Sequence, residues 1–355
     1  MQSDEMHVVG LMSGTSLDGL DVACCRFFKR AGEGIGYDLV AADTYPYDEA
    51  WRRRLSTLHE ADALGYALAS VQLGELFGRR VNEFIARHGC KVDLIASHGH
   101  TVFHQPDKHL TTQIADGNAI RAVTGVPVAC NFRALDVALG GQGAPLVPIG
   151  DKLLFGDYAA CLNLGGFANV SYDSQGGVRI AFDVSPCNMP LNELAALCGL
   201  PYDKDGALAA HAEVDSLLLE KLNGLPYYCQ QPPKSLGKEW YLECFRPLMA
   251  AVEPRVALAT VVEHVAMQVA RSLPACAAGG RMLVTGGGAR NSYLVERIRH
   301  HLQGVEAVVP DNDTIDYKEA IVFALLGYLR MRGEVNVLAS VTGARRDSCC
   351  GDLIF

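Results

Sequence analysis

The sequence predicts an α/β protein built from two similar domains, and three observations lead to this class. The chain of 355 residues is long for one hydrophobic core and suits two. Each half begins with strand patterns and continues with alternating helical and strand patterns. Each half also opens with a glycine-bearing hairpin, at residues 13–19 and at Gly165 and Gly166. We expect a cleft between the domains, in which both hairpins face one ligand and from which closure excludes water.

In the first half, strand patterns come first and the strongest helical pattern follows. From Ala61 to His88 apolar residues recur at helical spacing, which predicts a long helix. Residues 140–148 read G-G-Q-G-A-P-L-V-P, a composition typical of a loop or hinge. The expected strands are 7–12, 21–28, 37–43, 92–97, 111–114 and 126–130, and a further helix is expected from Asp116.

The second half repeats this order of elements. The expected strands are 158–164, 167–172, 178–183, 282–285 and 305–309, and the expected helices are 189–199, 238–248, 255–273, 291–301 and 316–332. Glycine and proline at 224–226 and 232–233 indicate an irregular segment. We assign residues 1–137 and 318–355 to the first domain and residues 138–317 to the second.

Composition and charge exclude several function classes. An apolar content of 49% and a charged content of 20% are globular values. The net charge of -9, without a long basic run, argues against a nucleic-acid partner or an anionic membrane surface. No apolar run is long enough to predict a membrane span.

The cysteines indicate a reducing compartment. The twelve cysteines are scattered, and none belongs to a C-x-x-C pair. The N-terminal M-Q-S-D-E-M has no apolar leader. We therefore expect reduced thiols and a cytoplasmic protein.

Residues 9–21, V-G-L-M-S-G-T-S-L-D-G-L-D, form the most informative stretch of the chain. Gly10, Gly14 and Gly19 allow a sharp turn and a close approach of the backbone to a ligand. Consecutive amides in such a turn form an anion-sized concavity, and carboxylates beside it can hold a hydrated magnesium ion. The hydroxyls and carboxylates of the stretch belong to Ser13, Thr15, Ser16, Asp18 and Asp21. The stretch predicts one half of a binding site for a nucleotide triphosphate.

The second hairpin lies in C-L-N-L-G-G-F-A-N-V-S-Y, residues 161–172. Gly165 and Gly166 stand between two strand patterns, as a phosphate-contacting turn requires. An ordinary tight hairpin has the same composition. Together with the first loop, the functional interpretation is favoured.

A third glycine run, Gly286, Gly287 and Gly288, lies between strand and helix patterns in L-V-T-G-G-G-A-R-N. A helix N-terminus behind glycines attracts anions or accommodates a flat ring, and simple turn chemistry is the alternative. The run is not G-x-G-x-x-G, so a dinucleotide fold and a dehydrogenase are poorly supported.

Asp183 ends a strand pattern in I-A-F-D-V-S-P-C-N. A carboxylate at a strand terminus that faces a cleft can act as a general base. The alternative is a cap for the helix expected near Met189, for which Asn188 is better placed.

Several other polar residues have two interpretations each. Four histidines cluster in S-H-G-H-T-V-F-H-Q-P-D-K-H, residues 97–109, but no cysteine or carboxylate completes a familiar zinc spacing. Polar contacts to a substrate are favoured for His98 and Thr101.

Arg133 would clamp a substrate carboxylate or pair with Asp136. Glu319 would contact substrate or complement a helix dipole, and Lys234 belongs to a surface loop or to a flap over the substrate.

The whole set of motifs resembles the bacterial anhydro-N-acetylmuramic acid kinases, within the superfamily that contains sugar kinases and actin. The resemblance spans nearly the whole chain, and the order of the motifs is highly specific. The motifs are G-L-M-S-G-T-S-L-D-G-L-D (10–21), S-H-G-H-T (97–101), G-G-Q-G-A-P-L-V-P (140–148), L-N-L-G-G-F-A-N (162–169), Y-D-K-D-G (202–206), P-P-K-S-L-G (232–237), T-G-G-G-A-R-N (285–291) and S-V-T-G-A (340–344).

The resemblance implies a two-domain, actin-like (ribonuclease H-like) ATPase fold with a central cleft between the domains. It also implies a kinase that uses ATP, magnesium and water to open a 1,6-anhydro sugar and to phosphorylate its 6-oxygen. Such an enzyme would serve peptidoglycan recycling in the cytoplasm and would form a homodimer, with no nucleic-acid or membrane partner.

The resemblance also implies roles for particular residues. Asp183 would be the base that activates water, and Asp18 would be the magnesium ligand. The nucleotide would contact Gly14, Thr15, Ser16, Leu17, Asp18, Gly19, Leu20, Asp21, Gly165, Gly166, Gly286, Gly287 and Gly288. The sugar would contact Ser13, His98, Thr101, Arg133, Asn188 and Glu319.

The chain departs from the family pattern near the expected base. The usual segment is F-D-T-G-P-G-N, whereas residues 182–188 read F-D-V-S-P-C-N. If the two replaced glycines used a positive φ, Ser185 and Cys187 would reshape the loop. Asn192 also stands where Asp is common, and His100 replaces a usual glutamine.

Two rival functions remain at this point. One is a kinase for another small sugar on the same scaffold. The other is a non-catalytic, actin-like nucleotide-binding regulator, which would bind ATP without sugar-stimulated turnover.

Overall fold

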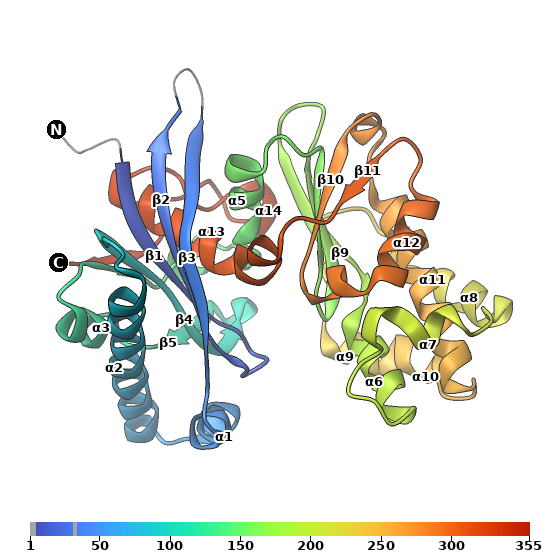
Figure 1. The fold of residues 1–355 in the computed structure, drawn as a ribbon, viewed down its shortest axis with the longest axis horizontal. Helices are drawn as coiled ribbons and strands as arrows, with labels where there is room; N and C mark the ends of the chain where they lie inside the picture. The colour runs from blue at the N-terminus through green and yellow to red at the C-terminus, as the bar shows by residue number, and fades with distance from the viewer. Residues whose placement is uncertain (1–4, 31–33) are drawn as a thin grey trace. The chain divides into compact units, whose positions relative to one another are not determined.

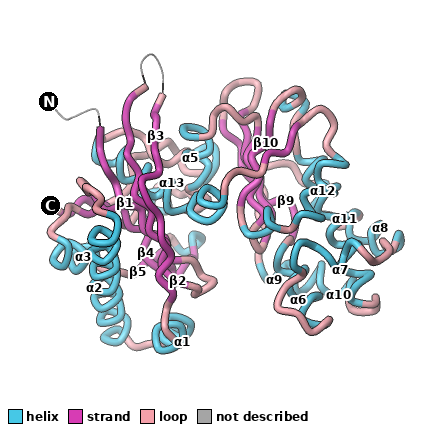
Figure 2. Tube along the Cα trace, viewed as in Figure 1, coloured by secondary structure: helices cyan, strands magenta, loops and turns pink. Residues whose placement is uncertain are grey.

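The computed structural model describes residues 5–30 and 34–355 and consists of two compact units (Figures 1 and 2). Unit 1 comprises Met1–Leu154 and Tyr317–Phe355, and unit 2 comprises Phe155–Asp316. The first four residues, on which the expectation of no apolar leader partly rests, lie outside the described residues.

Unit 1 contains a seven-stranded sheet with the order β12-β6-β4-β1-β2-β3, and β5 pairs with β4. Strands β1, β2 and β3 form an antiparallel meander, while β4 lies parallel to both β1 and β6. The strands are β1 (Glu5–Ser13), β2 (Gly19–Lys29), β3 (Ile35–Pro46), β4 (Leu94–Gln105), β5 (Leu110–Ile114), β6 (Val128–Cys130) and β12 (Asp352–Ile354).

Helices cover both faces of this sheet. Along β2, Val22 and Cys24 belong to the core beneath α2 and α3, whereas Ala23 and Cys25 belong to the core beneath α5 and α13. This alternation follows from the period of two in a strand. The helices are α1 (Glu49–Thr57), α2 (Ala63–His88), α3 (Gly117–Thr124), α4 (Ala134–Ala138), α5 (Val147–Leu154), α13 (Asn312–Arg332) and α14 (Ala339–Thr342).

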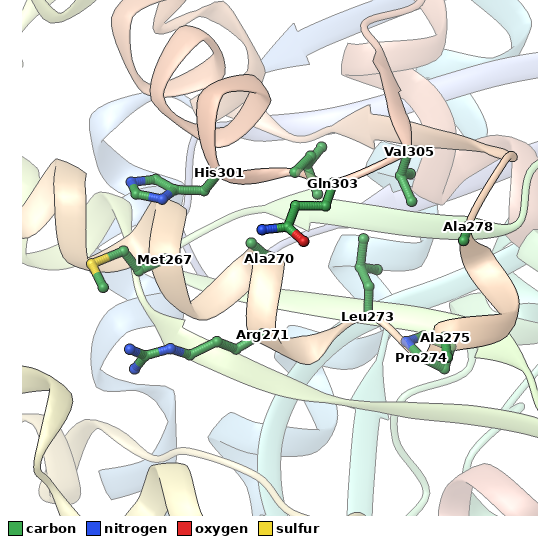
Figure 3. A pocket seen from close by; sticks show the side chains of 11 residues that line it. Met267, Ala270, Arg271, Leu273, Pro274, Ala275, Ala278, His301, Gln303 and Val305 are labelled. Carbon is green, nitrogen blue, oxygen red and sulfur yellow. The ribbon is translucent and has the colours of Figure 1, made fainter.

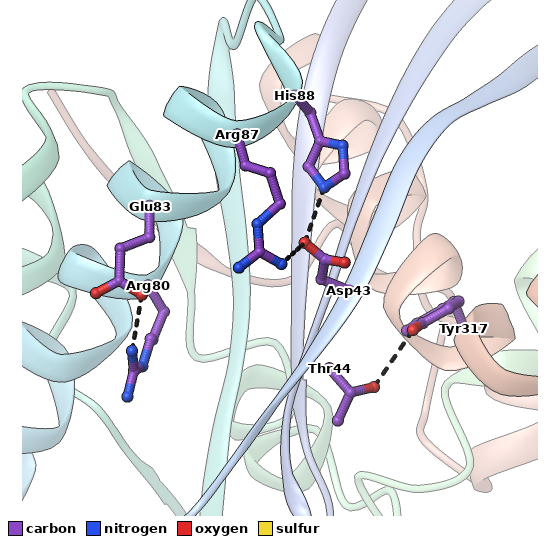
Figure 4. Close-up of polar contacts among 7 residues, drawn as sticks. All are labelled: Asp43, Thr44, Arg80, Glu83, Arg87, His88 and Tyr317. Atoms are coloured by element: carbon purple, nitrogen blue, oxygen red, sulfur yellow. Dashed lines mark hydrogen bonds and ion pairs between the residues drawn. The ribbon is translucent and has the colours of Figure 1, made fainter.

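Helix α2 shows how local sequence produces an element. The Asp62 side chain accepts from the Gly65 amide at its start, and Gly89 ends it in the left-handed conformation. Its buried residues Leu73, Phe77, Val81 and Phe84 recur at helical spacing. At its last turn, Arg87 Nη1 and His88 Nε2 lie 3.0 and 2.8 Å from the Asp43 carboxylate of β3 (Figure 4).

Unit 2 repeats the strand order of unit 1. Its five-stranded sheet has the order β11-β10-β7-β8-β9, with an antiparallel meander β7-β8-β9 and with β10 parallel to both β7 and β11. The strands are β7 (Ala160–Leu164), β8 (Phe167–Asp173), β9 (Arg179–Pro186), β10 (Arg281–Thr285) and β11 (Glu306–Val308). The prediction of an α/β fold in two similar halves is confirmed.

The core of unit 2 lies between this sheet and its helices. Apolar side chains of β7, β8 and β9 pack with those of α6, α11 and α12 in one buried cluster. Helix α11 is almost wholly enclosed, from Ala257 to Val269. The helices are α6 (Asn188–Leu197), α7 (Ala207–Ala210), α8 (Ser216–Asn223), α9 (Lys238–Trp240), α10 (Arg246–Met249), α11 (Pro254–Ser272) and α12 (Ser292–His301).

The division of the chain differs from the expected one, because unit 1 extends to Leu154 rather than to residue 137. Residues 140–148 are expected as a loop, yet helix α5 begins within them and packs on α13, where a Cβ on Gly150 would lie 2.3 Å from Val322. The expected helix 238–248 is interrupted by a π-helical turn at Tyr241–Phe245.

Candidate active site

The first glycine loop of unit 1 joins β1 to β2. Its turn is closed by a hydrogen bond of 3.3 Å from the Leu17 amide to the Gly14 carbonyl. Leu17 has a φ of 62°, whereas Gly14 and Gly19 do not have a positive φ. The expectation that these glycines make the sharp turn is therefore wrong. The Leu17 side chain packs against the core and offsets the strain of its left-handed backbone.

The part of this loop that faces solvent is shorter than the predicted nucleotide site. Thr15, Ser16 and Asp18 are exposed. Gly19 already belongs to β2, where a Cβ would lie 2.5 Å from the Tyr45 carbonyl oxygen, and the Leu20 side chain lies in the core. Only residues 14–18 thus remain accessible to a ligand, and the exposed side chains among them are those of Thr15, Ser16 and Asp18.

The carboxylates of this loop differ in their surroundings. Asp21 accepts a hydrogen bond of 2.6 Å from the Thr44 hydroxyl of the neighbouring strand, and Thr44 lies 3.5 Å from the Tyr317 hydroxyl (Figure 4). Asp18 is exposed. Within the described ranges no cluster of three or more histidine, cysteine or acidic side chains is placed to hold a metal. An exposed Asp18 nevertheless fits magnesium, which is usually bound by one or two carboxylates together with phosphate oxygens and water.

Ser13 lies in a buried polar cluster at the end of β1. The Tyr47 hydroxyl donates to Ser13 Oγ at 2.7 Å, and Ser13 Oγ lies 3.0 Å from His100 Nδ1. Since Ser13 accepts from Tyr47, its own proton is free to go to His100 Nδ1. Burial lowers the pKa of His100 to about 4, so this ring is neutral. The sequence interpretation missed Tyr47, for which no local pattern exists.

Arg133 is held by its neighbours, and the predicted pair with Asp136 is absent from the described contacts. Arg133 Nε donates to His98 Nε2 at 3.0 Å, and Arg133 Nη1 donates to the Gly143 carbonyl at 2.6 Å. Asp136 instead accepts from the Gly143 amide and from the Thr342 hydroxyl, both at 2.8 Å. These bonds leave Nη2 of the guanidinium available to a substrate.

His98 is neutral in this arrangement. Its Nε2 accepts from Arg133, and its Nδ1 lies 3.0 Å from the Gly99 carbonyl, to which it donates. Burial first, and then the charge of Arg133, hold the pKa of His98 well below its usual value. His98 therefore supports Arg133 rather than presenting a free ring nitrogen.

The remaining predicted substrate residues of unit 1 are placed differently. Glu319 is exposed, and its carboxyl lies within electrostatic reach of Arg133 and Asp21. It does not begin its helix, because α13 starts at Asn312, so the helix-dipole interpretation is wrong. Thr101 accepts from Gln113 Nε2 of β5 at 3.3 Å rather than joining Ser13 and His98.

In unit 2, the glycine hairpin forms the cap of helix α6. The amides of Cys187 and Asn188 donate to the carbonyls of Gly166 and Gly165 at 2.8 and 3.0 Å. Neither glycine has a positive φ, and a Cβ on Gly166 would meet only Met189 Cε at 3.9 Å. At Gly165 a Cβ would lie 3.3 Å from the Phe167 carbonyl oxygen, so the hairpin itself favours glycine there. Only Gly166 favours the close approach of a ligand over the ordinary-hairpin interpretation.

The third glycine run lies directly against this hairpin. Gly286 has a φ of 81°, and a Cβ there would come within 2.4 Å of Asn163 Oδ1. A Cβ on Gly288 would lie 2.7 Å from Leu164 Cβ and 2.9 Å from Asn188 Oδ1. The run does not itself open helix α12, whose N-cap is Asn291. Gly286 and Gly288 thus allow this loop to pack closely against residues 163–164 and Asn188.

Asn188, a predicted sugar ligand, stands between these two loops. Its Nδ2 donates to the Leu164 carbonyl at 2.8 Å, and a Cβ on Gly287 would lie 3.8 Å from it. The structure therefore groups Asn188 with the predicted nucleotide loops of unit 2. Asn188 does not cap α6 through its side chain, and the N-cap is Cys187.

Asp183 lies within β9, the edge strand of the sheet of unit 2. Its carboxylate accepts from the Leu236 amide at 2.9 Å, its amide donates to the Lys234 carbonyl at 3.3 Å, and its carbonyl accepts from the Tyr227 hydroxyl at 2.6 Å. Burial raises the pKa of Asp183, and the Leu236 amide acts in the opposite direction. Asp183 caps no helix, so the alternative interpretation is wrong.

Segment 227–236 therefore covers the free edge of β9, and we call it the edge segment. It contains Lys234, whose Nζ lies 4.6 Å from the Tyr227 ring centre and 3.3 Å from the Tyr227 carbonyl. Burial lowers the pKa of Lys234. Lys234 is half-buried between exposed neighbours, so a surface loop and a flap over the substrate both remain open for it. The motif P-P-K-S-L-G was the signal that could have placed this segment beside Asp183.

The two residues that replace family glycines fit without a positive φ. The register between β8 and β9 shifts so that Ala168 pairs with Ser185 and Asn169 with Asp183, which leaves Val184 as the extra residue of a bulge. Ser185 and Cys187 are fully buried. The loop is thus built around these side chains rather than strained by them.

One cavity of about 350 Å³ lies in unit 2 (Figure 3), lined by side chains that include Met267, Arg271, Leu273, His301 and Gln303. It contains none of the predicted site residues. Within residues 5–30 and 34–355, no helix has the length and apolar composition that crossing a bilayer requires. All twelve cysteines are free thiols.

Comparison with known proteins identifies relatives over the whole chain. A family model described as anhydro-N-acetylmuramic acid kinase matches residues 6–355. A relative named anhydro-N-acetylmuramic acid kinase from Gloeobacter violaceus is 37% identical over 383 residues, covering 99% of this chain and 99% of that protein. A relative of the same name from Xanthomonas oryzae pv. oryzae is 36% identical over 364 residues, covering 96% of this chain and 95% of that protein.

Solved structures resemble the chain more distantly. The activator of 2-hydroxyisocaproyl-CoA dehydratase from Clostridium difficile with bound ADPNP has a TM-score of 0.43 and 14% identity, covering 92% of this chain and 96% of that one. Component A of (R)-2-hydroxyglutaryl-CoA dehydratase from Acidaminococcus fermentans has a TM-score of 0.46 and 13% identity, covering 92% and 99%. Likenesses at this level carry no inference about function.

Proposed function

The chain belongs to the anhydro-N-acetylmuramic acid kinase family, and from this premise we propose that it uses ATP to open and phosphorylate 1,6-anhydro-N-acetylmuramic acid. The reaction is a phosphotransfer to an alcohol oxygen. The observation that carries the proposal is Asp183, a half-buried carboxylate with a raised pKa, held at the edge of β9 by the edge segment. A carboxylate in such surroundings is suited to general base catalysis.

The proposed chemistry proceeds in two linked steps. Asp183 takes a proton from water, and the water oxygen forms a bond to the anomeric carbon of the sugar. The bond from that carbon to the bridging oxygen breaks, which leaves the electron pair on the 6-oxygen. The 6-oxygen then attacks the γ-phosphorus of ATP, and ADP leaves. Ring opening thus creates the nucleophile where the phosphate is positioned.

We propose that ATP uses both sets of glycine loops. The exposed residues 14–18 would contact its phosphates, as would Gly165 and Gly166, and residues 286–288 would lie on the adenosine side. Asp18 would hold magnesium, which would offset the charge of the phosphate oxygens. Arg133, through its remaining Nη2 donors, and Glu319 would bind the sugar.

The proposal also covers the setting of the enzyme. The free thiols of the chain suit a reducing compartment, so we place the reaction in the cytoplasm, in peptidoglycan recycling. We also propose a homodimer, as the sequence resemblance implies. Light scattering of the purified protein tests this oligomeric state, and a monomer at micromolar concentration would contradict it.

The decisive test replaces the proposed base. We expect Asp183→Asn to lower turnover of the anhydro sugar by about 10²-fold or more, because the proton acceptor is lost, while ATP affinity stays unchanged. The matched control is Asp215→Asn, since Asp215 caps α8 and asparagine caps equally well. Near-normal turnover in Asp183→Asn would remove Asp183 from the mechanism.

Isotope labelling separates this reaction from phosphorylation of an ordinary hydroxyl, the alternative raised by Ser185 and Cys187. In water enriched in oxygen-18, only hydrolytic ring opening places a solvent oxygen on the anomeric carbon in step with phosphorylation. A phosphorylated product without this label, in which the bridge remains closed, would favour the alternative sugar kinase.

A further inference from the structure

The edge segment holds Asp183 through three bonds, and the segment itself is held by a buried polar network. The Tyr228 hydroxyl lies 2.8 Å from His264 Nε2 and 3.4 Å from Ser185 Oγ. His264 belongs to α11 and is fully buried, and Ser185 belongs to β9, two residues after Asp183. The network therefore connects the start of the edge segment both to the core and to the strand of Asp183.

The network has one consistent direction of hydrogen bonding. Gln268 Nε2 donates to Asn223 Oδ1 at 2.7 Å, so that oxygen is an acceptor. His264 Nδ1, 2.9 Å from the same oxygen, must then carry the proton. His264 Nε2 is left as an acceptor, and Tyr228 donates to it. Burial lowers the pKa of His264 to about 3, which keeps the ring neutral and this direction fixed.

A buried polar network costs free energy of folding if any member is left unpaired. When every member is paired, the network fixes one geometry. Aromatic packing strengthens the same point, since the Tyr228 ring lies edge-on to His264 at 5.0 Å and to the neighbouring Tyr227 at 5.6 Å. Tyr227 in turn donates to the Asp183 carbonyl. Because Tyr227 directly precedes Tyr228, a displacement of Tyr228 would also displace the Tyr227 hydroxyl that binds the Asp183 carbonyl.

We propose that Tyr228 and His264 are positioning residues for Asp183: they hold the edge segment so that Tyr227, Lys234 and Leu236 keep the carboxylate in place. Ser185, where the family usually has glycine, adds a second contact to the Tyr228 hydroxyl. This inference rests on the proposed role of Asp183 as the base. Neither Tyr228 nor His264 is required to touch the substrate.

The expected signature is a change in the titration of Asp183. Among the described residues, the titratable side chain in contact with Asp183 is Tyr227 of the edge segment, and burial first, and then Asp183, raise the Tyr227 pKa. The Lys234 ammonium instead lies over the Phe182 and Tyr227 rings. The Leu236 amide favours the ionised carboxylate. If the edge segment loosens, this bond weakens, but water also reaches the carboxylate. Because burial is the larger of the two causes, the pKa of Asp183 then falls toward its ordinary value. The acid limb of the rate profile, which requires ionised Asp183, then moves to lower pH.

The test is Tyr228→Phe, which removes the hydroxyl and keeps the ring. We expect the pKa of Asp183 to fall, as measured by carbon-13 NMR of the labelled carboxyl and assigned with Asp183→Asn. We also expect the acid limb of kcat to move with it, and kcat at neutral pH to fall about tenfold or more, with the KM for ATP unchanged.

The matched control is Tyr241→Phe, the same substitution in the same core. Tyr241 is buried, and its hydroxyl donates to Glu193 Oε2 at 2.6 Å, away from the edge segment. We expect this variant to have a lower Tm and an unchanged Asp183 pKa. If Tyr228→Phe likewise lowers the Tm and leaves the Asp183 pKa and kcat unchanged, Tyr228 has only a structural role and the inference is overturned.

A second pair of variants covers the case in which Tyr228→Phe folds poorly. His264→Gln retains a polar group for Tyr228, and His264→Ala does not. We expect the glutamine variant to restore kcat and the Asp183 titration toward wild type relative to the alanine variant. Equal values for kcat and for the Asp183 pKa in both variants would contradict the positioning role.

The NMR titration also separates this inference from the proposed function. It needs no substrate, so a shift of the Asp183 pKa in a protein that does not process the anhydro sugar supports positioning and removes the proposed reaction. The opposite outcome is a turnover that depends on Asp183 together with an Asp183 pKa that Tyr228→Phe leaves unchanged. That outcome supports the proposed reaction and contradicts the positioning role of Tyr228.

Discussion

Gly10 lies where α13 crosses β1, and its missing side chain permits that crossing. A Cβ at Gly10 would come within 1.9 Å of the Ala320 carbonyl oxygen, a backbone atom that cannot move aside. We expect Gly10→Ala to destabilise the protein by about 3 kcal/mol or more, because strand and helix must separate. Urea unfolding measures this change in the free energy of unfolding.

Gly14, in the same motif, provides the control. A Cβ there would meet only Ser16 of its own loop, at 3.4 Å. We expect Gly14→Ala to change stability by less than about 1 kcal/mol and to weaken ATP binding, since the added methyl group stands in the proposed phosphate loop. Equal destabilisation by both substitutions would contradict the packing argument for Gly10.

The pKa of Asp183 also predicts a stability effect. Burial raises this pKa in the folded state, so the folded protein binds the proton more tightly than the unfolded chain. Stability from this group is present at low pH and is lost as pH rises through the folded pKa. We therefore expect Asp183→Asn to have a higher Tm than wild type at pH 7, with a difference that shrinks near pH ~4, where the unfolded carboxyl is protonated. Calorimetry at both pH values measures it, and a lower Tm at pH 7 would contradict the sign.

At the scale of elements, helix α6 and the glycine hairpin are tied together by Asn188. We expect Asn188→Ala to cost about 1–3 kcal/mol, because it leaves the Leu164 carbonyl without this donor. Since Asn188 lies among the proposed nucleotide loops, we also expect weaker binding of an ATP analogue, measured by calorimetry. Loss of sugar affinity with unchanged ATP affinity would instead restore the role predicted from the sequence.

Most elements with a strong periodic pattern were predictable. The helix expected at 61–88 is α2, with its Asp62 cap and its Gly89 terminus, and the meander strands lie close to their expected bounds. Helix α5 was not predictable, because glycine and proline in its sequence favour a loop. Tertiary packing of Gly150 against Val322 stabilises it instead.

The candidate site was predictable as a set of motifs but not as a set of contacts. The motif around Asp183 indicates a carboxylate at a strand end, and nothing local indicates that Tyr227 and Leu236 bind it. These partners are 44 and 53 residues away in the chain. An edge strand needs a covering segment, but the alternation of apolar and polar residues along the strand does not indicate which segment covers it.

At the scale of the whole molecule, three buried histidines couple stability to pH. Burial lowers the pKa of His100 to about 4, that of His264 to about 3, and that of His98 well below its usual value. The unfolded chain therefore takes up protons that the folded protein excludes, and stability falls as pH drops below about 6.5. Each such proton contributes a slope of about 1.4 kcal/mol per pH unit.

Urea unfolding between pH 7.5 and 5 tests this coupling. We expect His264→Gln to take up about one proton fewer on unfolding than wild type, and so to have a shallower pH dependence. A slope in His264→Gln identical to that of wild type would mean that this ring is protonated in the folded state.

The repeated strand order was the most reliable inference about the whole chain. Three strands followed by alternating helix and strand predict a meander with parallel additions, and both sheets have this order. The exact limits of the units were less predictable, since α5 joins unit 1 through the packing of its Gly150 on Val322 of α13, which is 322 − 150 = 172 positions further along the chain.

The discontinuous unit 1 has a consequence for biosynthesis. The strands that carry Val8, Ala23 and Phe27 leave the ribosome first. Phe323 and Leu326, in the part of α13 that covers them, are translated after all of unit 2. A nascent chain can thus complete its inserted unit while the earlier sheet still has a bare apolar face. Until α13 is made, this exposed apolar face can aggregate, and we expect production of the protein to depend most on chaperones at that stage.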